Sequence, residues 1–162
     1  MSHPVLEATS VMGAALKSVA DTSPVFMSTD DKATALRALV RVEAQTVELR
    51  LRIMPEAGDV AEQTAAHDIA SWLTDQTRAR FEDARADQAL ARSLDRRYPV
   101  LGLALREGDA NLAQAQVIAT ALDGLPAEVP SAVLALAEAT LVGHAAKFGP
   151  RPLGRLGRRI LD

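Results

Sequence analysis

The chain has 162 residues, a size at which one domain buries an ordinary core, and we expect a single helical domain over residues 1–162. Its apolar share of 48% comes mainly from alanine and leucine, and only 3% of the residues are aromatic, which favours closely packed helices over sheets. The absence of cysteine excludes disulfides and thiolate metal sites, and a net charge of −3 excludes a general electrostatic attraction to nucleic acid.

The chain also lacks the usual signals for secretion or membrane insertion. Its first ten residues carry no lysine or arginine, unlike the start of a secretory signal peptide. The most apolar later stretch, residues 129–146, is interrupted by Pro130, Glu138 and His144. We therefore expect a cytoplasmic protein without a membrane segment.

The spacing of apolar residues predicts helices in the first half of the chain. The first helix begins at Pro4 and runs to Asp21. A sequence close to a capping box, Ser28 to Asp31, opens a long second helix. This helix ends at Pro55, because proline lacks a backbone N–H and its ring clashes with the preceding turn. Residues 59–66 are compatible with either a loop or an irregular helix.

The second half of the chain predicts shorter helices with clear boundaries. Asp68 is the expected N-cap of a short helix that contains Trp72, and we expect this tryptophan to anchor the core. After a turn at 77–80, four more helices follow, over residues 81–94, 98–108, 112–123 and 130–148. The last segment, 152–161, is predicted to be a basic helix that Gly154 and Gly157 weaken by about 1 kcal/mol each. The fold class is therefore all-α, a compact domain of about seven to eight helices with one long helix.

The residues needed for catalysis do not occur in a recognisable arrangement. His3, His67 and His144 are not at the spacing of metal ligands, so we expect no metal and no cofactor. Gly154 to Gly157 lacks the strand and the Lys-Ser/Thr pair of a phosphate-binding loop. Acidic pairs lie in predicted first turns, where they favour the helix dipole. We therefore expect no enzymatic activity and no small-molecule substrate.

One pair of predicted helices has the outline of a helix-turn-helix, in which the second helix lies in the DNA major groove. In this second helix Arg85, Arg92 and Arg96 lie on one side, where they can meet phosphates. The alternative is a solvated face, because Glu82 and Asp95 share the segment.

The C-terminal segment is the most basic part of the chain. Residues 147–162 contain five basic residues and one acidic residue, whereas the rest of the chain is acidic. A basic last turn also arises simply because it favours the helix dipole. The predicted phosphate contacts are Arg78, Arg85, Arg92, Arg96, Arg151, Arg155, Arg158 and Arg159.

Three stretches resemble a known family. They are Ile69 to Arg78, then Leu101 to Gly108 followed by Leu112 to Leu122 and Leu125-Pro126, and finally Gly149 to Arg159. The family is the domain of unknown function 222 (DUF222), also called the 13E12-repeat family, and the resemblance covers residues 30–160. The sequence departs from the family at Arg80, where a Ser or Thr cap is frequent, and at the two tail glycines.

The resemblance implies a nuclease-associated module. In that family the helical domain typically precedes a C-terminal HNH endonuclease domain, and residues 147–162 are expected to lead to such a domain, which this chain lacks. We therefore expect a non-catalytic module that binds or targets nucleic acid, with DNA as its partner. The alternative is a helical oligomerisation or protein-interaction module, such as a homodimer through the long helix, with no contact to nucleic acid.

Overall fold

The computed structural model describes residues 2–161, and these residues contain helices but no strand, as the sequence predicts. Nine α-helices and two short 3-10 helices are present in this part of the chain. In chain order they are α1 (Pro4–Ser18), η1 (Pro24–Phe26), α2 (Thr29–Ile53), η2 (Met54–Glu56), α3 (Gly58–Gln63), α4 (Ile69–Thr77), α5 (Phe81–Arg96), α6 (Pro99–Glu107), α7 (Leu112–Asp123), α8 (Ser131–His144) and α9 (Pro150–Leu161).

The chain divides within α2 into two units, residues up to Arg37 and residues from Ala38 onward. The first unit consists of α1, η1 and the start of α2, and none of its described side chains is buried. Its large apolar side chains are exposed, and the exposed fraction of Phe26 is 92%. The second unit contains the core and the predicted site residues.

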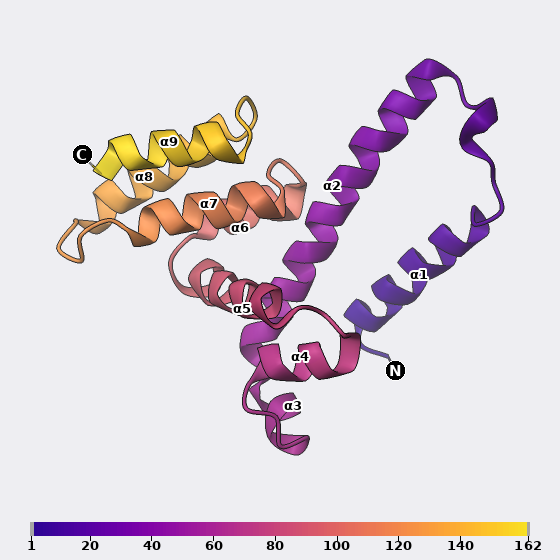
Figure 1. The fold of residues 1–162 in the computed structure, drawn as a ribbon, viewed down its shortest axis with the longest axis horizontal. Coiled ribbons are helices and arrows are strands. Elements are labelled where there is room, and N and C mark those ends of the chain that lie inside the picture. The colour runs from indigo at the N-terminus through magenta and orange to yellow at the C-terminus, as the bar shows by residue number, and fades with distance from the viewer. Residues whose placement is uncertain (1, 162) are drawn as a thin grey trace. The chain divides into compact units, whose positions relative to one another are not determined.

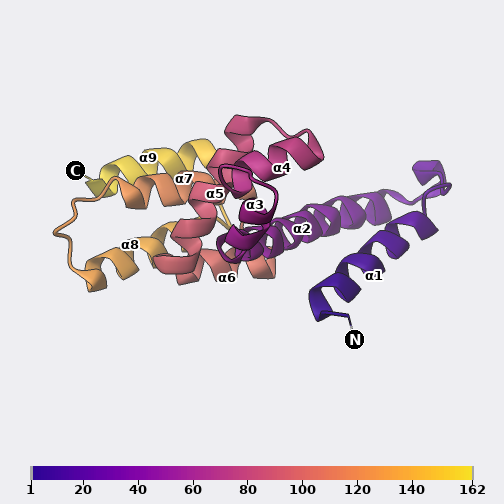
Figure 2. The same cartoon turned by 90° about the horizontal axis from the view of Figure 1, so that it is seen from below.

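The second unit is built from two groups of helices. Helices α6 to α9 form two pairs, α7 with α9 and α6 with α8, which lie side by side in both views (Figures 1 and 2). The other group consists of η2, α3, α4 and α5, and α5 also packs against α6 and α7. The long helix α2 contributes Ala44, Val47 and Leu51 to the core.

The predicted helix ends are formed by the residues that the sequence indicates. The Asp68 carboxylate accepts a hydrogen bond from the Ser71 backbone N–H over 2.8 Å, at the start of α4. Asn111 caps α7 in a complete capping box with Gln114. Helix α2 ends at Ile53, and Pro55 lies in the 3-10 turn that follows. Residues 58–63, which the sequence left open, form the short helix α3.

The aromatic residue at the centre of the core is Tyr98, and the prediction that Trp72 anchors it was wrong. Trp72 is only partly buried and packs against the edge of the core. Tyr98 is fully buried, and its hydroxyl donates a hydrogen bond to the Asp123 carboxylate over 2.5 Å. A buried tyrosine needs a hydrogen-bond partner for its hydroxyl, and Asp123 at the end of α7 supplies it. Tyr98 therefore lies between α5 and α6, within reach of the end of α7.

The C-terminal segment forms the helix that the sequence predicts, although two glycines lie within it. A Cβ atom on Gly157 would lie 2.5 Å from the Ala121 Cβ atom, so the missing side chain lets α9 approach α7 closely. Leu153 is fully buried in the same contact region of α9. Packing against α7 therefore compensates for the low helix propensity of the two glycines.

These two glycines give a matched pair of substitutions. Gly154→Ala should raise the free energy of unfolding by about 1 kcal/mol, because the new Cβ atom would lie 3.5 Å from the Val117 side chain, an ordinary contact. Gly157→Ala should lower it by about 1 to 3 kcal/mol, partly offset by better helix propensity, because the new methyl group collides with Ala121. Urea unfolding of both variants measures whether the two changes in the free energy of unfolding have opposite signs. Equal changes would contradict the close approach of α9 to α7 at Gly157.

Candidate functional site

The α4–α5 pair holds the first group of predicted arginines. Arg85, Arg92 and Arg96 are all exposed on α5, whereas Ala84 and Ala91 on its other side are buried. The Arg85 guanidinium lies over the Phe81 ring, 5.7 Å from its centroid, and Phe81 itself is 43% exposed.

The turn between α4 and α5 places Arg78 in an unusual backbone conformation. Arg78 ends α4 with a φ of 60°, in the left-handed region that glycine normally occupies at a helix end. Its side chain is exposed. Arg80 precedes α5 without a side-chain hydrogen bond to the helix, so the departure from the family pattern leaves this helix start uncapped by its N-cap side chain.

Buried and partly buried polar contacts fix α4 relative to α5. The side-chain oxygen of Gln88 on α5 accepts a hydrogen bond from the Ala70 backbone N–H at the start of α4, over 3.1 Å. Hydrogen bonds from Ser71 lower the pKa of Asp68 below its ordinary value, so its carboxylate stays charged while it caps α4. Arg50 of α2 forms an ion pair with Asp87 at 2.8 Å. The arginine side of α5 is therefore held outward by contacts on its opposite side.

The second group of predicted arginines lies on α9. Four exposed arginines lie on one side of this helix, because the last three follow the first by four, seven and eight residues. They are Arg151, Arg155, Arg158 and Arg159. Leu153 and Leu156 lie on the other side and pack against the core. Arg158 also borders a shallow hollow with Val117 and Thr120 of α7.

None of these eight arginines forms an ion pair with another residue of the described chain. The five ion pairs found among residues 2–161 use other arginines instead. These are Arg41 with Asp109, Arg50 with Asp87, Arg52 with Glu48, Arg97 with Asp123, and Arg106 with Glu48. Arg37 and Arg80 likewise form no ion pair in the described part of the chain. The arginines thus divide into a set that holds helices together and a set whose charge is left for solvent.

The structure brings the predicted arginines together within each helix. Three are on α5 and four on α9, and both helices pack against α7. Arg78 is not on either helix but at the end of α4.

A buried acidic group lies at the start of α6. Glu138 of α8 is buried, and its carboxylate accepts a hydrogen bond from the Leu101 backbone N–H over 2.8 Å, at the first turn of α6. Burial raises the pKa of Glu138, while hydrogen bonds from Leu101 and Val100 partly oppose this shift. Tyr98, the N-cap of α6, makes no side-chain cap, so Glu138 supplies one from another helix.

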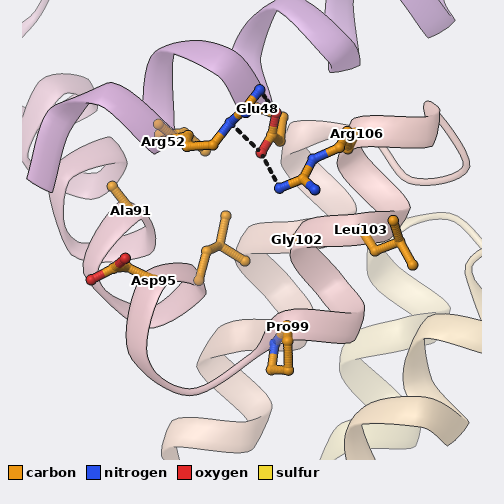
Figure 3. A pocket seen from close by; sticks show the side chains of 10 residues that line it. Glu48, Arg52, Ala91, Asp95, Pro99, Gly102, Leu103 and Arg106 are labelled. Carbon is orange, nitrogen blue, oxygen red and sulfur yellow. Dashed lines mark hydrogen bonds and ion pairs between the residues drawn. The ribbon is translucent and has the colours of Figure 1, made fainter.

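A polar hollow between α2, α5 and α6 was not predicted from the sequence (Figure 3). Glu48 is buried at its edge, and its carboxylate is shared by Arg52 and Arg106, each at 3.2 Å. The i, i+4 spacing of Glu48 and Arg52 is visible in the sequence, but the contact with Arg106 joins residues far apart in the chain.

Residues suited to metal binding do not converge in the described structure. No group of three or more His, Asp or Glu side chains could hold a metal ion among residues 2–161. His3 caps α1, and the rings of His144 and Phe148 lie 5.6 Å apart. In the same residues no helix is both long and apolar enough to cross a bilayer.

The comparisons with known proteins give one match. The family model described as "Domain of unknown function (DUF222)" matches residues 30–162. No curated protein and no solved structure matches the chain. The match begins at the second residue of α2 and contains α3 to α9, and therefore both groups of predicted arginines.

The raised pKa of Glu138 predicts a specific pH dependence of stability. Because the folded state binds this proton more tightly than the unfolded state, the contribution of Glu138 to the free energy of unfolding falls as the pH rises. We therefore compare the free energy of unfolding of the wild type with that of Glu138→Gln. The wild-type free energy minus the variant free energy should decrease from pH 4.5, the ordinary pKa, up to the raised pKa, and stay constant at higher pH. Urea unfolding at a series of pH values measures this difference, and a difference that increases with pH would contradict the assignment.

Proposed function

This chain belongs to the DUF222 family, a domain of unknown function, and we propose that it is a non-catalytic module that binds nucleic acid. The observation that carries the proposal is the arginine side of α9. Four exposed arginines follow one side of a twelve-residue helix without an acidic residue in its sequence. Such a stripe fits the regularly spaced phosphates of a nucleic-acid backbone.

Helix stability does not account for the whole stripe. Arginines in a last turn are favoured by the helix dipole, and this explains Arg158 and Arg159. Arg151 lies in the first turn, where a positive charge is unfavourable, and Arg155 lies in the middle of the helix. These two arginines therefore need another explanation, and contact with an anionic partner supplies one.

The α4–α5 pair supports the same proposal. Arg85, Arg92 and Arg96 lie on the exposed side of the second helix of a helix-turn-helix-like pair. Arg78 ends α4 with an exposed side chain, at the turn that leads into α5. We include Arg78 among the proposed phosphate contacts for this reason.

The biological setting of the proposal comes from the family resemblance. Because DUF222 domains typically precede an HNH endonuclease domain, we propose that this module positions nucleic acid for a nuclease of that type. In this proposal the described residues contribute affinity and orientation, and the chemistry belongs to the nuclease. DNA is the proposed partner, bound mainly through its phosphates.

A second candidate function is self-association, and one observation favours it. In the first unit, residues 2–37, no side chain is buried, although seven large apolar side chains are exposed there. These are Leu6, Val11, Leu16, Val19, Val25, Phe26 and Leu36. Helices of this length are marginal in water without tertiary packing, so a second copy that covers them would stabilise the unit.

Removal of two α9 arginines tests the proposed function. The double substitution of Arg155→Gln and Arg158→Gln should weaken binding to duplex DNA at low salt. It should also reduce the slope of log affinity against log salt concentration by about 1.8, because each phosphate contact contributes about 0.9. Fluorescence anisotropy at a series of salt concentrations measures both quantities.

A matched control separates local contacts from net charge. Lys17→Gln with Arg37→Gln removes the same two charges from the first unit, at positions outside the proposed interface. The control should bind like the wild type. Equal losses in both variants, or no duplex binding by the wild type, would contradict the proposal, and a salt-insensitive dimer in light scattering would then favour self-association.

A further inference from the structure

The hollow between α2, α5 and α6 has the features of a small binding site. Its volume is about 300 Å³, at the lower end of the range for sites that bind small molecules. Its apolar lining includes the buried residues Leu51 and Ala91 and the partly buried Leu94. Its polar edge consists of Glu48, Arg52, Arg106 and Asp95, and Figure 3 shows Asp95 away from the two arginines.

Gly102 keeps one side of this hollow open. It is buried in the interior of α6, where glycine costs about 1 kcal/mol relative to alanine. Nevertheless, a Cβ atom built on Gly102 would meet no atom within 4 Å, and the residue lines the hollow. The other glycines with such open space, for example Gly143 in α8, are exposed. The fold does not require glycine at this position, so the space that a side chain would occupy is available to a ligand.

The charges around the hollow are arranged to receive a single anion. At the arginine end of the hollow, Glu48 carries one negative charge and the two arginines that share it carry two positive charges, which leaves one positive charge in excess there. Asp95, at another part of the rim, brings the four side chains together to a net charge of zero. The Arg52 side chain remains 54% exposed and the Arg106 side chain 51% exposed. Of the five N–H donors on each guanidinium, Glu48 accepts a hydrogen bond from one of Arg52 and from one of Arg106, and the Arg52 Nε atom lies 3.2 Å from the same carboxylate. The remaining donors include groups free to bind a second carboxylate.

The buried carboxylate also prepares the two guanidinium groups for binding. Glu48 is only 5% exposed, and it holds an arginine from α2 and another from α6 at the same edge of the hollow (Figure 3). Ordering two long side chains costs free energy, and here the fold provides much of that order before a ligand arrives. The second carboxylate would therefore meet a partly preorganised pair of donors.

We propose that this hollow binds a small organic monocarboxylate with an apolar body, whose carboxylate contacts Arg52 and Arg106 and whose body lies over Gly102. The excess positive charge is confined to the arginine end of the hollow, which favours one carboxylate over a polyanion such as nucleic acid. Asp95, exposed on the rim, disfavours a second negative group on the ligand. This site is independent of the proposed nucleic-acid interface on α5 and α9, which uses none of these residues.

Two variants and three probes test the proposal. The three probes are benzoate, its neutral analogue benzyl alcohol and its cationic analogue benzylamine. In a titration followed by NMR, benzoate should shift the backbone amide signals of residues 102 and 106 and bind at least about tenfold more tightly than either analogue. Gly102→Ala should weaken benzoate binding by about tenfold or more, because the added methyl group occupies the space where the body of the ligand would lie. It should also move the urea midpoint upward, because alanine favours the helix. Arg106→Gln should weaken benzoate binding by a similar factor.

The control is Gly143→Ala, which makes the same change at an exposed glycine of α8 with equally open space. It should leave benzoate binding unchanged. The proposal is overturned if Gly102→Ala binds benzoate like the wild type, or if benzyl alcohol binds as tightly as benzoate. It is also overturned if an acidic, apolar peptide shifts these signals and benzoate does not, since the surface would then be a docking site for protein.

Discussion

Ends of α4, α6 and α8 are supported by side chains from other helices, and the packing of the second unit depends on this constraint. Helices α4 to α9 have 9 to 16 residues, lengths at which an isolated helix is marginal in water. Glu138 of α8 caps the start of α6, and Gln88 of α5 supports the start of α4. The Arg41 side chain on α2 donates to the Glu107 carbonyl at the other end of α6, over 2.7 Å. A helix that borrows its caps cannot move without leaving backbone groups unsatisfied.

The same constraint leads to the proposed interface. The Gln114 side chain on α7 donates to the carbonyl oxygens of Ala145 and Phe148, at 2.8 and 2.9 Å, just before α9 begins. The chain is thereby held at the point where α9 starts, and Gly157 lets α9 lie close against Ala121 of α7. With Leu153 buried on the inner side, the four arginines of α9 are left on the outer side. The exposed charge is therefore a consequence of how this helix is packed.

Local signals made most of the secondary structure predictable from the sequence. Asp68 and Asn111 cap the helices that they were expected to cap, and Pro55 marks the end of the long helix, because these effects act within a few residues. The predicted sides of α5 were also correct, since Ala84 and Ala91 are buried and Arg85, Arg92 and Arg96 are exposed. Two predicted helices ran several residues too far, to Asp21 and Phe148, where α1 ends at Ser18 and α8 at His144.

The features that could not be predicted depend on contacts between distant residues. Trp72 was expected to anchor the core, but the fully buried aromatic residue is Tyr98, whose hydroxyl bonds to Asp123, 25 residues away. Gly157 was interpreted as a weak point from its low helix propensity alone. Its close contact with Ala121 could not be predicted, because Ala121 belongs to another helix. The hollow was missed for the same reason, since Glu48 and Arg106 are 58 residues apart.

Mapping the surface that responds to DNA tests the central claim most directly. In an amide NMR titration of the isotope-labelled protein with a short duplex at low salt, the account predicts shifts concentrated on α9, from Arg151 to Arg159, and on the exposed side of α5. It also predicts that the signals of residues around Gly102 stay in place. Shifts confined to the first unit, or no shifts at a concentration of duplex well above that of the protein, would contradict the account.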